Sequence, residues 1–95
     1  MFIVTLRFAA NRDKAGALMD EHNAWLRRGF EEGILLLAGS LQPRAGGVIL
    51  ANGVSREALN AFVQSDPFVA ENVVAAEVLE VVPGRTDPRL AFLAA

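Results

Sequence analysis

The chain opens with Phe2-Ile3-Val4-Thr5-Leu6-Arg7-Phe8, and this stretch decides the fold because its residues alternate strictly. One side of it is wholly apolar and carries Phe2, Val4, Leu6 and Phe8. A period of two is typical of a strand with one face in the core. The sequence therefore starts with a strand whose opposite face presents Arg7.

A helix is expected next, over about residues 13–30. Asn11 and Asp13 are candidate caps for its first turn. The following residues recur at the spacing of one helical stripe: Ala15, Leu18, Met19, His22, Trp25, Leu26 and Phe30. His22 belongs to this stripe, so its imidazole is predicted to point inward.

Two short apolar runs, 33–41 and 47–51, follow and are joined by turn residues 42–46. They predict a hairpin whose strands are covered on both faces. A second helix is expected to begin at the cap residue Ser55, and the Asp66-Pro67 pair is the pattern of a cap and first position of a new helical turn. The β-branched segment 73–82 reads as a last strand.

The order β-α-β-β-α-β predicts an α+β ferredoxin-like sandwich, with two helices on one face of a four-stranded antiparallel sheet. The helices cannot cover both faces, yet the 34–38 and 48–51 runs are apolar on both. We therefore predict a homodimer that packs through the sheet face. The domain is expected to span 1–84, and the apolar tail 85–95 is expected to dock on its own or the partner subunit.

Composition excludes several classes of protein. The 95 residues contain no cysteine and one histidine, so neither a disulfide nor a metal site is expected. A net charge of −2 argues against nucleic-acid binding. The longest apolar run, Ile34 to Ala38, is too short to cross a membrane, and a cytoplasmic protein is expected. Gly46-Gly47 lacks any nucleotide-binding pattern.

His22 is the side chain best suited to exchange protons near neutral pH. An inward-facing histidine needs a hydrogen-bond partner, and Asp66 is the best candidate because Pro67 fixes its backbone. Two interpretations stay open. The two residues can form a catalytic pair, or Asp66 can cap its turn while His22 satisfies a core hydrogen bond.

Four further residues are candidates for contact with a ligand. Ser40 ends the second strand without a nucleophile-elbow pattern, so it can polarise an oxygen but is more simply structural. Trp25 and Phe68 can wall an apolar pocket or belong to the core. Arg7, on the face assigned to the dimer, should pair with a carboxylate or bind an anionic ligand.

His22, the run Gly33 to Ser40, Gly46-Gly47 and Asp66-Pro67-Phe68-Val69 together resemble the YciI-like (YCII-related) family over about residues 2–82. The resemblance implies a ferredoxin-like fold, pairing as a dimeric α/β barrel, and an active-site pair carried here by His22 and Asp66. The chain departs from the family at Ser40, where many members carry proline, and in its long apolar tail.

The resemblance points to a small enzyme without a cofactor, a lyase or isomerase acting on a small, aromatic-derived molecule. His22 would be the general acid or base, Asp66 would orient it, and Ser40 and Arg7 would anchor an oxygen. The alternative is a dimeric ligand-binding or accessory module in which the pair is structural. A cofactor-free monooxygenase of the same fold class is a weaker third possibility.

Overall fold

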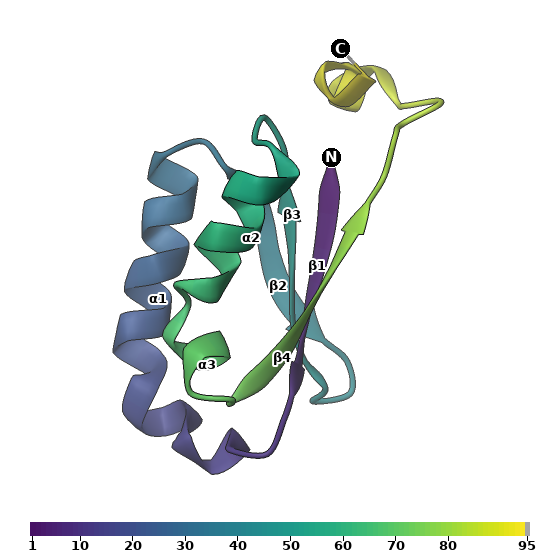
Figure 1. The fold of residues 1–95 in the computed structure, drawn as a ribbon. Helices are drawn as coiled ribbons and strands as arrows, with labels where there is room; N and C mark the ends of the chain where they lie inside the picture. The colour runs from purple at the N-terminus through teal and green to yellow at the C-terminus, as the bar shows by residue number, and fades with distance from the viewer. Residues whose placement is uncertain (95) are drawn as a thin grey trace.

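The computed structural model describes residues 1–94 and contains four strands and three α-helices among them (Figure 1). The strands are β1 (Phe2–Phe8), β2 (Leu35–Leu41), β3 (Gly46–Ala51) and β4 (Val74–Glu80). The helices are α1 (Ala15–Glu31), α2 (Arg56–Gln64) and α3 (Pro67–Ala70). Two short 3-10 helices are also present: η1 (Arg12–Lys14) precedes α1, and η2 (Pro88–Ala94) follows β4.

The sheet has the order β2-β3-β1-β4, and all neighbouring strands are antiparallel. The three α-helices lie on one side of it (Figure 1). This arrangement confirms the ferredoxin-like fold. The alternation in β1 places Phe2, Val4 and Leu6 in the core, where each is at most 6% exposed. Trp25 of α1 and Leu59 of α2 are buried against them.

The second helix and the short third helix begin as the sequence predicts. The Ser55 side chain accepts a hydrogen bond from the amide of Ala58 (3.1 Å) and caps α2. The Asp66 side chain accepts one from the amide of Phe68 (3.0 Å), with Pro67 as the first residue of α3. Each cap satisfies an amide that the helix itself leaves without an acceptor.

The first helix starts differently from the prediction. The 3-10 turn η1 precedes α1, and Asn11 caps neither element through its side chain. Instead, the Asn11 side-chain amide donates to the carbonyl of Glu71 (2.9 Å) and ties the start of the helical layer to the segment before β4. The prediction of a cap at Asn11 is therefore wrong, because its side chain finds a distant acceptor.

The inward stripe of α1 also departs from expectation at its end. Phe30 is 45% exposed, while Gly29 is buried. A Cβ at Gly29 would come within 2.7 Å of both Leu35 and Phe62, so α1 approaches β2 and α2 too closely for any side chain there. This contact fixes how near α1 lies to the sheet.

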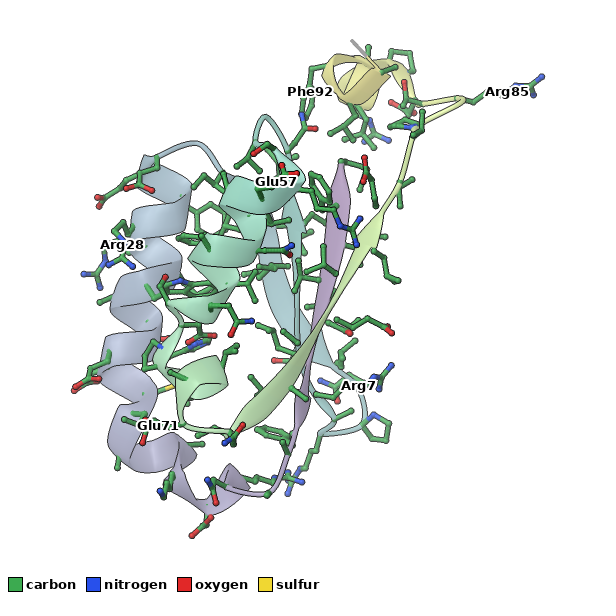
Figure 2. The ribbon with its side chains drawn as sticks, in the orientation of Figure 1. Arg7, Arg28, Glu57, Glu71, Arg85 and Phe92 are labelled. Atoms are coloured by element: carbon green, nitrogen blue, oxygen red, sulfur yellow. The ribbon has the colours of Figure 1, made fainter. Side chains whose placement is uncertain are left out.

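The side of the sheet away from the helices is uncovered, and we call it the open face. Its residues alternate with the core residues along the strands: Ile3, Thr5, Arg7, Leu37, Leu50, Ala75, Glu77 and Leu79. Leu37 and Leu79 are each more than 40% exposed. Apart from Thr5 and the charged residues Arg7 and Glu77, these residues are apolar, and Arg7 projects from the face in Figure 2.

The segment after β4 leads to η2, which stands apart from the helical layer near the N-terminal end of β1 (Figure 1). Asp87 organises its start by accepting hydrogen bonds from the backbone amide and the side chain of Arg89 (2.9 and 3.0 Å). The side-chain bond lowers the pKa of the Asp87 carboxyl. Leu90 and Phe92 remain about half exposed, and Ala95 lies outside the described residues. Docking of this tail stays a prediction.

Replacing Gly29 with alanine should destabilise the fold by about 1–3 kcal/mol, because the added methyl group overpacks the contact with Leu35 and Phe62. Gly16→Ala on the same helix is the matched control, since a Cβ there meets open space. It should be neutral or stabilising by up to about 1 kcal/mol. Urea unfolding measures both. Equal effects of the two substitutions would contradict the close approach of α1.

Candidate active site

His22 and Asp66 meet across the helical layer. Nδ1 of His22 lies 2.8 Å from Oδ1 of Asp66, although 44 residues separate them in the chain. Asp66 is fully buried, and the His22 side chain is 12% exposed. The structure therefore brings together the two residues that the sequence pairs, with the carboxylate inside and the imidazole at the edge of the core.

Two aromatic rings lie beside the imidazole. The ring of His22 is nearly parallel to that of Phe68, with centroids 4.0 Å apart and an interplanar angle of 4°. Trp25, one helical turn after His22, has its ring centroid 5.7 Å away. The hydrogen bond and the Phe68 stack leave the imidazole one orientation in which Nδ1 reaches Asp66.

His22 lines a cavity of about 320 Å³ between α1 and the sheet, which we call the His22 cavity. Its lining is mostly apolar and comprises Leu6, Phe8, Met19, His22, Asn23, Leu26, Ala38, Gly39, Ser40, Gly46, Gly47, Val48, Ile49, Phe68 and Val74. The polar side chains in this set are those of His22, Asn23 and Ser40. Such a concave apolar site with a few convergent polar groups is typical of small-molecule binding.

The partner of Nδ1 determines what the other ring nitrogen can do. An ionised carboxylate only accepts hydrogen bonds, so the proton of a neutral His22 belongs on Nδ1. Nε2 then carries the free lone pair and has no hydrogen-bond partner among residues 1–94. The hydrogen bond to Asp66 thus leaves Nε2 as the ring nitrogen available to another group.

Of the four other predicted site residues, two line the cavity, one lies in the core and one lies on the open face. Ser40 and Phe68 line the His22 cavity. Trp25 is 1% exposed in the core and is not among the lining residues; its indole nitrogen donates to the carbonyl of Phe62 (2.9 Å) and to Oγ of Ser65 (3.1 Å). Arg7 lies on the open face, away from the cavity, and forms no ion pair within residues 1–94 (Figure 2).

Several lining residues were not singled out from the sequence. Met19, Asn23 and Leu26 lie on α1 one turn or less from His22, so helical spacing could have assigned them to the same site. Gly46 and Gly47 entered the sequence analysis as a failed nucleotide motif and as part of the family resemblance, not as residues that line a cavity. Gly47 contributes by leaving space, which no residue pattern in a single sequence reveals.

Within residues 1–94, no group of three or more histidine, cysteine or acidic side chains is placed to hold a metal ion. No helix among these residues is both long enough and apolar enough to cross a membrane.

The fold and the site place the chain among small two-layer ferredoxin-like domains, with a buried carboxylate next to a histidine that lines a cavity. The model of the YCII-related domain matches residues 1–83, and the chain belongs to this family. The family prediction is confirmed. The search of curated proteins gives no significant match.

The chain also resembles a solved structure, 5-chloro-2-hydroxyhydroquinone dehydrochlorinase (TftG) from Burkholderia phenoliruptrix AC1100 in complex with 2,5-dihydroxybenzoquinone. The TM-score is 0.69 at 17% sequence identity, and the match covers 88% of this chain and 96% of that chain. At this identity the likeness establishes a shared fold.

The hydrogen bond to Asp66 predicts that neutral His22 carries its proton on Nδ1. ¹⁵N chemical shifts of the ring report the tautomer, and the single histidine removes any ambiguity of assignment. Asp66→Ala should abolish this preference. Asp20→Asn, at an exposed position on the helix that carries His22, should preserve it. Ring shifts that do not change in Asp66→Ala would contradict the predicted role of the carboxylate.

Proposed function

We propose that this protein is a small-molecule enzyme that uses His22 and Asp66 for general acid-base chemistry without a cofactor, in an elimination or an isomerisation. The observation that carries the proposal is the 2.8 Å contact between Nδ1 of His22 and the fully buried carboxylate of Asp66. It leaves the second ring nitrogen without a partner among residues 1–94, and His22 is one of the residues that line the His22 cavity.

The state of the second carboxylate oxygen supports a functional role for the pair. Oδ1 of Asp66 accepts from Phe68 and contacts His22, whereas Oδ2 is buried without a hydrogen-bond partner among the described residues. Leaving a buried polar atom unpaired costs about 1–3 kcal/mol. A carboxylate retained only for stability would be expected to use both oxygens, so the arrangement favours the orientation and charge stabilisation of His22.

In an elimination, Nε2 of His22 takes a proton from the substrate. The electron pair of the broken bond forms a new double bond, and the leaving group departs with its own electron pair. Asp66 stabilises the imidazolium until the proton passes to product or solvent. In an isomerisation, the same nitrogen returns the proton to another atom of the substrate.

An aromatic-derived substrate is supported by the fold and by the cavity. The neighbour of the same fold is named for the dehydrochlorination of a chlorinated hydroxyhydroquinone. The His22 cavity offers the ring of Phe68 and aliphatic walls to such a molecule. Ser40, which lines the cavity, would accept a hydrogen bond from or donate one to an oxygen of the substrate.

His22→Ala and Asp66→Asn should each lower kcat/KM by about 10²–10⁴-fold, which is the usual contribution of a positioned acid or base. The first assay is chloride release from 5-chloro-2-hydroxyhydroquinone, the compound that appears in the name of TftG. Asp20→Asn makes the same chemical change at an exposed position and should retain wild-type turnover.

Circular dichroism should show that His22→Ala and Asp66→Asn remain folded. Two results would reverse the assignment. Turnover at the wild-type level in folded His22→Ala would show that His22 is not the general base. Unfolding of both variants would instead favour a structural hydrogen bond within a ligand-binding or accessory module.

The open face supports a homodimer in which two sheets pack together. Arg7 of β1 and Glu77 of β4 are the charges on this apolar face, and neither forms an ion pair within residues 1–94. They lie on adjacent strands, where Thr5 is opposite Glu77 and Ala75 is opposite Arg7. Covering the face with a second copy would bury both charges, and each would then need the other as its partner.

Light scattering of the wild-type protein should give twice the 10.2 kDa mass of one chain. Arg7→Glu and Glu77→Arg should each weaken association at least about tenfold, because each leaves two like charges in the interface. The double variant Arg7→Glu/Glu77→Arg should recover much of the loss. A wild-type monomer at micromolar concentration would exclude the dimer.

A further inference from the structure

The charge of the lining restricts what the His22 cavity can bind. The lining residues include no arginine, lysine, aspartate or glutamate. The ionisable group among them is His22, and the carboxylate of Asp66 stands directly behind it. A carboxylate or phosphate placed in the cavity would lose water without gaining a cationic partner other than the imidazole, and this desolvation is unfavourable.

Arg12 is a cation that contacts a lining residue of the cavity. Its guanidinium carbon lies 4.1 Å from the centroid of the Phe8 ring, and Phe8 lines the cavity. Arg12 itself is exposed and is not part of the lining. Its charge is engaged with a ring face rather than with the cavity interior, so it does not neutralise an anion beside His22.

The size of the cavity depends on a missing side chain. Gly47 of β3 is paired with Leu6 on one neighbouring strand and with Ser40 on the other. Leu6 faces the helices, so a side chain at position 47 would project into the same layer and occupy the His22 cavity. A Cβ at Gly47 would meet one atom, the carbonyl oxygen of Gly39 at 3.3 Å, so alanine fits there after a small adjustment.

Gly46 differs from Gly47 in this respect. Its φ is +129°, and an added Cβ would collide with the backbone of Leu6. The backbone therefore requires glycine at position 46, whereas no such requirement applies at position 47. At position 47, the lack of a side chain leaves volume in the His22 cavity.

The volume that results sets a scale for the ligand. A closed apolar cavity of about 150 Å³ holds one benzene molecule. The His22 cavity measures about 320 Å³ and is partly open to solvent, so it has room for one substituted ring, and any limit on size comes from its inner wall at Gly47.

We infer that the His22 cavity selects an uncharged molecule of single-ring size that presents an O–H or C–H proton to Nε2 of His22, and that Gly47 sets the upper limit on its size. The transfer of that proton rests on the proposed function, whereas the selection by charge and size is a property of binding alone. Asn23 and Ser40 supply the remaining polar contacts from the cavity wall.

Three probes test the inference: phenol, 4-ethylphenol and benzoate at neutral pH. NMR titrations that follow the ring signals of His22 report binding at this site without any turnover. Phenol should shift these signals, and benzoate, which has similar size but an unpaired charge, should bind at least about tenfold more weakly. The ethyl group should improve the affinity of 4-ethylphenol over phenol by about tenfold through burial of two carbons.

Substitutions at Gly47 test the limit on size. Gly47→Ala should reduce the preference for 4-ethylphenol, and Gly47→Val should abolish or reverse it. Gly16→Ala adds the same methyl group outside the cavity and should leave the preference unchanged. Because each variant is judged by the ratio of two affinities, a modest loss of stability does not affect the result, and Gly47→Ala remains informative where Gly47→Val folds poorly.

The inference is overturned if phenol does not perturb His22, if benzoate binds as tightly as phenol, or if the ratio is the same in Gly47→Ala as in the wild type. Tight benzoate binding that is lost in Arg12→Ala would place an anion site at the cavity mouth instead. Selective phenol binding together with absent acid-base turnover would contradict the proposed function and leave this inference intact.

Discussion

The buried carboxylate of Asp66 is the constraint on which the helical layer and the candidate site both depend. Its Oδ1 caps α3 through the amide of Phe68 and at the same time contacts His22 on α1. A single atom thus connects two helices and, together with the stacked ring of Phe68, orients the imidazole. The other oxygen of Asp66, Oδ2, is buried without a partner among the described residues, and this lowers the stability of the fold. The stability of the fold and the orientation of His22 are therefore linked at Asp66.

Close packing on one part of α1 contrasts with open space on another. Gly29 lets the C-terminal half of the helix approach β2 and α2, because any Cβ there would collide with Leu35 and Phe62. Nearer the N-terminus, His22 and its neighbours face Gly47, where the sheet offers no side chain. Small residues therefore serve opposite purposes in one layer: Gly29 closes the core, and Gly47 leaves room beside the imidazole.

The sequence predicted the fold class because the period of β1, the apolar stripe of α1 and the caps at Ser55 and Asp66 all indicate the same arrangement. The pairing of His22 with Asp66 followed from an inward histidine that needed a partner. An apolar pocket beside Phe68 was one of the alternatives, but its extent could not be foreseen, since it depends on the absence of a side chain at Gly47. Asn11 and Phe30 were misassigned because tertiary contacts, and not local spacing, decide where those side chains lie.

The position of Trp25 has a spectroscopic consequence. It is the single tryptophan of a chain without tyrosine, and its ring is 1% exposed, stacked at 4.5 Å on Phe62 and 5.7 Å from the imidazole. Two hydrogen bonds from its indole nitrogen hold it in place. Ultraviolet emission of the native protein therefore arises from one buried, hydrogen-bonded indole close to His22, which makes it a label-free probe of this part of the core.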